Sequence, residues 1–299
     1  VPSSDFKLLS EAGVIDGYSE TFTGYKLIGL FGRVGYTLSD KYIFNFVVRR
    51  DGSSRFGDNK KWGVFPSVST AWRLSEETFF KEKKWINDLK FRLSYGLTGN
   101  SDIGDFVAKP QFAGSGKYDN ISGIAPSIPG NKDLTWETKY SLNLGIDLAI
   151  FDNRITVQAD YFNDITKNLL FDRPVPINSG YTSIPQNVGS VRNRGLELSL
   201  NLVPIKNKDF SWSISPNFTW LKNKILSLID DASQIGTGLV VGKPIDVFYT
   251  YNFAGVNPAD GRPMWYDKDG YIVYKQNSVD RVYLNGIYPT FYGGIINSF

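Results

Sequence analysis

The stretch "LTWETKYSLNLGIDLAIFDNRITVQADYF" (residues 134–162) decides the fold. From Leu134 to Ile150 every even position is apolar except Thr138, whereas the odd positions are polar or small. A two-residue period is that of a β-strand, because successive side chains of a strand point to opposite faces, and a helix would scatter the same residues around its axis. The 17 residues from 134 to 150 extend ~56 Å at ~3.3 Å per residue, whereas a typical strand has about 5 or 6 residues.

The two faces of this predicted strand need different surroundings. Burying Glu137, Lys139 and Asp147 in a dry core would cost several kcal/mol for each unpaired charge, whereas a water-filled lumen carries no such cost. The apolar face then contacts lipid, and we expect aromatic residues to form interfacial girdles: Trp136, Tyr140, Trp212 and Trp220. The pattern favours an all-β antiparallel transmembrane β-barrel. The alternative is a soluble antiparallel sheet with one solvated face.

The alternation recurs along the chain and predicts roughly 10 or 11 strands. Short turns are expected at Ser39-Asp40, Asp152–Arg154 and Lys206–Asp209, because Asn and Asp favour tight turns. Between them lie long polar loops, near residues 51–61, 99–133, 171–193 and 223–245. Short turns that alternate with long loops are typical of outer-membrane barrels, so we expect these loops to be extracellular. Residues 75–87 are predicted to form a short helix with Ser75 as N-cap.

Composition excludes several classes of function. The chain has no cysteine and no histidine, which removes cysteine-ligated metal sites and nucleophile arrangements that need histidine. Its 33 basic and 30 acidic residues are scattered, unlike the clustered basic face of a nucleic-acid-binding protein. We expect no cofactor, because "IGTGLVVGKP" (235–244) lacks the spacing of a phosphate-binding loop and "DKDG" (267–270) lacks further calcium ligands. The latter is predicted to be a hairpin turn between residues 264–266 and 271–274.

Six ordered stretches point to a known family. They are "RRDGSSRFG" (49–57), "KWGVFPSVSTAWRLSEE" (61–77), "WINDLKFRLSYGLTGNSDIG" (85–104), "NLGIDLAIFDNRITVQADYFNDITKNLL" (143–170), "NVGSVRNRGLELSLN" (187–201) and "PTFYGGIINSF" (289–299). In wording and order they resemble the β-barrel of SusC/RagA-type TonB-dependent outer-membrane transporters. The resemblance covers most of residues 25–299.

The resemblance implies a Gram-negative outer-membrane receptor that imports bulky nutrients, either oligosaccharides or peptides, and is not an enzyme. Its barrel would have about 22 strands and work with an N-terminal plug, the TonB complex and a SusD-type surface lipoprotein. We therefore expect residues 1–299 to be one partial β-barrel domain surrounded by outer-membrane lipid and cut at both ends, with the plug and the TonB-binding segment missing. A soluble all-β glycan-binding module is the alternative function. An outer-membrane hydrolase is a further hypothesis, which the absence of histidine disfavours.

The candidate site residues fall into two groups. Substrate-path candidates are polar residues of predicted strands and of the 99–133 loop: Arg92, Glu137, Lys139, Asp147, Asp102, Asp105 and Tyr118. A polar wall paired across strands is an equally good interpretation of the strand residues. Residues in the family-like stretches are expected to have structural roles: Arg50, Asp51, Gly52, Arg55, Gly57, Asn100, Gly189, Arg192 and Gly195. We expect Arg192 and Arg194 to pair with charges in the lumen wall. The sequence does not identify the substrate.

Overall fold

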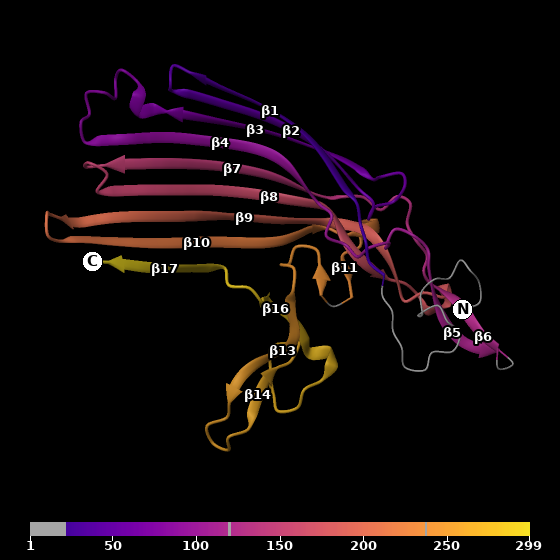
Figure 1. Ribbon diagram of the computed structural model, residues 1–299. Coiled ribbons are helices and arrows are strands. Elements are labelled where there is room, and N and C mark those ends of the chain that lie inside the picture. Colours follow the sequence, from indigo (N-terminus) through magenta and orange to yellow (C-terminus); the bar gives the residue numbers. More distant parts are fainter. Residues whose placement is uncertain (1–21, 119–120, 237) are drawn as a thin grey trace. The chain divides into compact units, whose positions relative to one another are not determined.

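A computed structural model describes residues 22–118, 121–236 and 238–299 of the protein. Within these residues, nine strands form the main sheet. Their order is β1-β2-β3-β4-β7-β8-β9-β10-β17, so the first eight follow the order of the chain (Figure 1). The printed registers are antiparallel for β1 with β2, β9 with β10, and β10 with β17. The bounds are β1 Leu27–Leu38, β2 Tyr42–Ser53, β3 Trp62–Arg73, β4 Ile86–Asn100, β7 Glu137–Ile150, β8 Ile155–Pro174, β9 Ser183–Lys206, β10 Ser211–Ser227 and β17 Phe291–Ser298.

Three smaller sheets accompany the main one. Hairpins are formed by β5 (Gln111–Tyr118) with β6 (Ile121–Ile128) and by β11 (Gln234–Ile235) with β12 (Leu239–Val240). A four-stranded sheet has the order β15-β14-β13-β16, with bounds Ile272–Val273, Pro263–Tyr266, Val247–Val256 and Arg281–Gly286. The pairing of β14 with β15 confirms the hairpin turn predicted at residues 267–270.

Helical structure is limited to single 3-10 turns in the part of the chain that the structure describes. They are η2 Leu74–Glu76, η3 Ile177–Ser179, η4 Ile229–Asp231 and η5 Ser278–Asp280. Within these described residues, no helix has the length and apolar character needed to cross a membrane. The prediction of an all-β fold is confirmed.

The short turns lie where the sequence predicts them. Ser39 and Asp40 connect β1 to β2 with positive φ angles of 52° and 57°. Asp152 and Asn153, at 55° and 60°, connect β7 to β8. Asp and Asn tolerate this left-handed conformation better than most residues, which explains why both turns use them. The connection from β9 to β10 is closed by a hydrogen bond from the Asn207 amide to the Phe210 carbonyl.

Some predictions of local structure are wrong. Residues 75–87 do not form a helix capped by Ser75, because only the 3-10 turn η2 forms, its N-cap is Arg73 and irregular turns follow. The loop predicted at 171–193 is mostly strand, because β8 runs to Pro174 and β9 begins at Ser183. The 99–133 segment contains the β5–β6 hairpin, and 223–245 begins within β10 and contains β11 and β12. Hydrogen bonding between strands continues there without apolar–polar alternation, so the sequence pattern does not reveal it.

The chain divides into two compact units, which are described separately. The first takes in the described part of Val1–Thr70 together with Ser94–Ser141 and Thr166–Val188. It contains the buried hydrophobic cluster of Phe56, Phe65, Ala108, Leu134 and Trp136. The second takes in Ala71–Leu93, Leu142–Ile165 and Gly189–Phe299.

The strands of the second unit have two distinct faces. We call one of them the inner face, because its side chains contact one another across the strands. A side chain at Gly145 would meet Arg92 and Asp160, and one at Gly195 would meet Phe162. The Asn223 side-chain amide donates a hydrogen bond to Asn193 on the same face. The alternate positions form the outer face. Its large apolar side chains are 36–50% exposed: Phe91, Leu93, Leu144, Ile146, Leu196, Leu198 and Phe218. A continuous exposed apolar surface of this kind marks contact with a membrane or a partner.

Candidate functional site

An ion cluster occupies the inner face of the second unit. The Arg92 guanidinium donates to both carboxylate oxygens of Asp147, at 2.8–3.1 Å, and to Asp160 Oδ2 at 3.0 Å. Lys90 Nζ lies 2.8 Å from Asp147 Oδ2. These residues come from β4, β7 and β8, so the cluster connects three neighbouring strands. Two cations and two anions make it formally neutral.

The surroundings of this cluster suit a water-lined wall. The side chains of Lys90, Arg92 and Asp147 are 24–29% exposed, whereas that of Asp160 is 11% exposed. Gly145 makes room for them, since a Cβ atom there would lie 2.5 Å from Arg92 Cζ and 2.6 Å from Asp160 Oδ1. A hollow of about 350 Å³ adjoins the cluster, and the polar residues of its lining come from five strands: Asp88, Asp147, Thr156, Gln158, Ser199, Asn201 and Ser215.

In the first unit, the "RRDGSSRFG" segment fixes the connection between β2 and β3. Arg55 Nε donates to Asp105 Oδ1 at 2.8 Å, and Arg55 Nη1 donates to the Ser101 carbonyl at 3.2 Å. The Gly57 amide donates to the Leu134 carbonyl at 3.0 Å. Asp58 pairs with Lys61 at 2.6 Å, and the hydrogen bond and charge of Lys61 lower the pKa of the Asp58 carboxyl. The segment is therefore joined to chain positions 46 to 77 residues further on.

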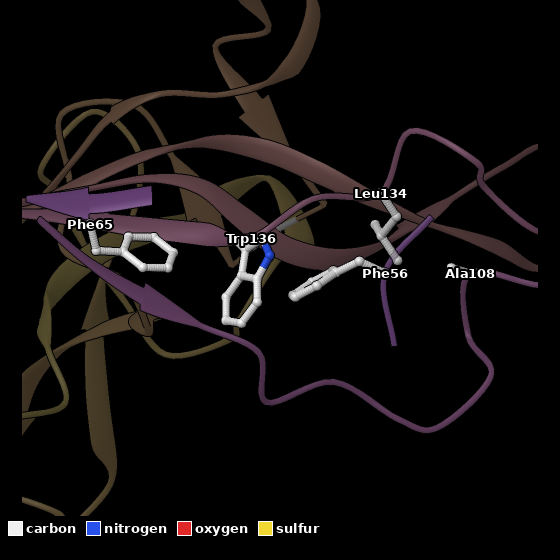
Figure 2. Close-up of a cluster of buried hydrophobic side chains, with 5 residues drawn as sticks. All are labelled: Phe56, Phe65, Ala108, Leu134 and Trp136. Atoms are coloured by element: carbon white, nitrogen blue, oxygen red, sulfur yellow. The ribbon is translucent and has the colours of Figure 1, made fainter. Parts of the chain in front are cut away.

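Trp136 is the centre of the buried cluster beside this segment. Figure 2 shows its indole between Phe65 and Phe56, with ring centroids 5.4 Å and 4.7 Å away. Its Nε1 donates to the Lys61 carbonyl at 3.0 Å, and Trp136 is only 5% exposed. The prediction that Trp136 belongs to a lipid-facing girdle is therefore wrong. Both Trp136 and Leu134 precede β7, and their even positions continue the alternation of the strand by coincidence.

A concave surface next to Trp136 carries a buried carboxylate. Asp51 is 7% exposed, and its Oδ2 accepts a hydrogen bond from Arg49 Nε at 2.6 Å. Its Oδ1 has no hydrogen-bond partner among the residues that the structure describes. The surrounding cavity of about 380 Å³ combines aromatic, hydroxyl and charged groups, which come from Arg49, Asp51, Phe65, Ser67, Thr98, Ser101 and Trp136 with apolar neighbours. Such a lining offers hydrogen bonds beside aromatic edges.

The structure brings some of the predicted substrate-path residues together. Arg92 pairs with Asp147, and Glu137 accepts hydrogen bonds from Asn100 Nδ2 at 3.4 Å and from the Leu170 amide at 3.3 Å. Asp105 is held by Arg55.

The remaining substrate-path candidates are Asp102, Lys139 and Tyr118. Asp102 lines a separate cavity of about 240 Å³, and Lys139 is exposed on β7. Tyr118 ends β5, but its side chain lies outside the described residues, as do residues 119 and 120 of the same predicted loop.

The remaining family-like residues mostly allow close packing. A Cβ at Gly52 would lie 2.8–2.9 Å from the Trp62 ring, over which Arg50 stacks at 4.8 Å. A Cβ at Gly57 would collide with the Lys132 backbone, and one at Gly195 with the Trp220 carbonyl. Gly189 has a φ angle of +62°, which glycine adopts without strain.

The expectation for Arg192 and Arg194 is wrong. Both alternate with Asn193 and Gly195 and therefore lie on the outer face, not on the inner wall. No ion pair involves either residue within the described part of the chain. Lys90 and Asp160 belong to the ion cluster as well, although the sequence pattern alone does not identify them as its members. Their alternation marks them as inner-face residues, but their partners on other strands are 55 or more positions away and depend on the register of the sheet.

Comparisons with known proteins all point to the same family. The model of the family described as "TonB dependent receptor-like, beta-barrel" matches residues 5–294. TonB-dependent receptor P39 of Formosa agariphila is 41% identical over 236 residues, covering 78% of this chain and 23% of that protein. TonB-dependent receptor SusC of Bacteroides thetaiotaomicron is 34% identical over 271 residues, covering 82% of this chain and 27% of that protein. The chain thus spans about a quarter of the length of these relatives.

A solved structure resembles the chain closely. The RagAB peptide transporter superposes with a TM-score of 0.82 at 30% identity, covering 91% of this chain and 31% of that one. The RagAB peptide importer in its "closed-closed" state gives the same TM-score and covers 98% of this chain.

Proposed function

Since the chain belongs to the TonB-dependent receptor family as part of the family's outer-membrane β-barrel, we propose that the full-length protein imports a bulky nutrient across the outer membrane. Proteins of this family are transporters and not enzymes, so the barrel contributes a wall and loops and no catalytic centre. The soluble glycan-binding module considered above does not agree with this membership.

The inner-face ion cluster is the observation that supports a transport path. Its charges are arranged around Gly145 beside a hollow that is lined by both polar and apolar residues, and they remain partly exposed to water. Because Arg92, Asp147, Lys90 and Asp160 neutralise one another, the wall offers hydrogen bonds without a strong field of one sign. We propose that a large polar solute moves past such a wall without being trapped by a single charge. The unsatisfied Oδ1 of Asp51, in the cavity of about 380 Å³, is the best candidate for a transient hydrogen bond to the solute.

The proposed substrate is an oligosaccharide or a peptide, delivered by a SusD-type surface lipoprotein, with energy from the TonB complex. The likeness to SusC and to the RagAB peptide transporter supports a partnership of this kind. The anchored segment around Arg55 and the connections between β4 and β7 (101–136), between β8 and β9 (175–182) and between β10 and β13 (228–246) are the proposed extracellular contacts. Among the substrate-path candidates, Asp105, Glu137, Arg92 and Asp147 have protein partners, so we assign them to the architecture of the path.

Deleting the full-length gene will abolish uptake of the protein's substrate while leaving uptake of free monosaccharides and amino acids unchanged. Whole cells are supplied with fluorescently labelled oligosaccharides and with labelled peptides, and internalised fluorescence is measured with and without a proton-motive-force uncoupler. Restoring the gene is the control and will restore uptake. If the deletion strain took up every tested oligosaccharide and peptide as well as the wild-type strain does, the proposed function would be contradicted.

The proposed lipoprotein partner is tested separately. Purification of the intact protein in mild detergent will recover this lipoprotein together with it.

A further inference from the structure

Four cations lie in two directly opposed pairs on β9 and β10. Arg194 is paired with Lys222, and Arg192 with Lys224, in the antiparallel register of these strands. The positions between them carry Asn193 and Asn223, whose amides are hydrogen-bonded at 2.6 Å. Opposed residues share a face, so all four cations project from the side opposite to the asparagines. We call these four residues the cationic quartet.

The cationic quartet continues the apolar outer face of the same strands. The next pairs on that face are Leu196 with Trp220 and Leu198 with Phe218, with no register shift between them and the quartet. Leu196 is 50% exposed and Phe218 is 45% exposed. An apolar surface therefore changes to a purely basic one within a single step of the alternation.

Charge balance distinguishes this site from the inner wall. None of the four side chains takes part in an ion pair within the described residues. Like charges placed directly opposite each other on a sheet are unfavourable. In addition, Arg192 Nε is buried without a hydrogen-bond partner in the described structure. Four cations at this spacing, one of them with a guanidinium nitrogen that has no partner among the described residues, form a surface that an anionic group would stabilise.

The distance from the short turn places the quartet at the edge of the membrane. Lys222 lies 11 residues after the start of β10 at Ser211 (222 − 211), which is ~36 Å along the strand at ~3.3 Å per residue and ~26 Å vertically at a tilt of ~45°. The apolar band of an outer-membrane barrel is ~25 Å tall. The quartet therefore lies where lipid headgroups begin, on the side away from the short β9–β10 turn, which is the extracellular side.

We propose that the cationic quartet binds the phosphate groups of a phosphorylated glycolipid of the outer leaflet, whose acyl chains cover Leu196, Leu198 and Phe218. Arginine suits this role because its planar guanidinium makes paired hydrogen bonds to phosphate oxygens. An amphiphilic anion meets both halves of the surface at once. A soluble anion would contact only the cations and would leave the apolar half of the surface uncovered.

Neutralising the quartet tests the proposal in the full-length protein purified in detergent. Binding of a diphosphorylated glucosamine-disaccharide glycolipid is measured by native mass spectrometry for the wild type and for R192Q/R194Q/K222Q/K224Q. We expect the quadruple variant to bind roughly tenfold more weakly or worse, because each headgroup-level cation contributes to attraction of anionic lipid. The dephosphorylated glycolipid will bind the wild type as weakly as the diphosphorylated lipid binds the variant.

A matched control separates this site from general charge effects. K206Q/K208Q removes cations from the opposite end of the same hairpin and should leave glycolipid binding unchanged. Heat-modifiable migration in gels verifies that each variant is folded. If the quadruple variant does not fold, two pair variants replace it, R194Q/K222Q and R192Q/K224Q. We expect each pair variant to lose part of the affinity for the glycolipid. Unchanged glycolipid binding by the folded variants would overturn the proposal. The proposal would also be overturned if the variants lost a protein partner but bound the glycolipid as the wild type does. Two further results would overturn it: the wild type binding the dephosphorylated and the diphosphorylated glycolipid equally well, or inorganic phosphate alone displacing the glycolipid.

Discussion

Replacing Trp136 by alanine will lower the free energy of unfolding of the full-length protein by about 3–5 kcal/mol, the range typical of large aromatic residues in a core. Trp136 contacts Phe56 and Phe65 and is 5% exposed, so its removal leaves a cavity among rings that are themselves buried. The substitution also removes one of the two donors to the Lys61 carbonyl, which keeps the hydrogen bond from the Ser53 amide. Unfolding by urea in detergent, followed by tryptophan fluorescence and gel migration, measures the loss.

Two control variants grade the loss at Trp136. Trp136→Phe keeps one aromatic ring in the cluster but removes the rest of the indole together with the Nε1 donor, so we expect a smaller loss, of about 1–3 kcal/mol. Trp85→Ala removes an indole that is 50% exposed and should cost about 1 kcal/mol or less. If Trp136→Ala proved no more costly than Trp85→Ala, the anchoring role of the buried cluster would be refuted.

A lysine at Leu144 will destabilise the barrel by about 2–4 kcal/mol, whereas a lysine at Asn143 will have little effect. Leu144 is on the outer face and is 45% exposed. It lies 6 residues from the end of β7 at Ile150 (150 − 144), which places it ~14 Å above the turn at a ~45° tilt and close to the middle of the ~25 Å apolar band. Asn143 is on the inner face, where water solvates an added ammonium group. The measurement is reversible unfolding of both variants in lipid vesicles.

The opposite result is equally informative. Similar losses for Leu144→Lys and Asn143→Lys would mean that the two faces of β7 do not meet different solvents. Leu144→Asn, which is polar without charge, should cost less than Leu144→Lys.

The sequence predicted the strands and short turns because both depend on neighbouring residues. Alternation along 142–150 needs no knowledge of the partner strands, and Asp152-Asn153 specifies a tight turn locally. Trp136 shows where this reasoning fails, because its burial depends on Phe56, Phe65 and the Lys61 carbonyl, which lie 71 to 80 positions away. The pattern at Leu134 and Trp136 matches that of the strand, but both side chains are apolar because they belong to the buried cluster with Phe56 and Phe65.

The charged residues show the same division. Alternation assigned Arg92 and Asp147 to one face, but it did not reveal Lys90 and Asp160 as their partners, because those contacts depend on register across three strands. Arg192 and Arg194 were assigned to the inner wall although their even positions place them with Leu196 and Leu198. Counting alternation outward from those leucines would have placed both arginines correctly.

The most direct test of two solvents on two faces uses single cysteines in a chain that otherwise has none. Spin labels at positions 141–147 of β7, in the full-length protein reconstituted in lipid, report accessibility to oxygen and to a water-soluble nickel chelate. We predict a two-residue period in which labels at 142, 144 and 146 contact oxygen and those at 141, 143 and 147 contact the chelate. Equal accessibility at odd and even positions, or chelate contact at 144, would contradict a membrane-spanning strand.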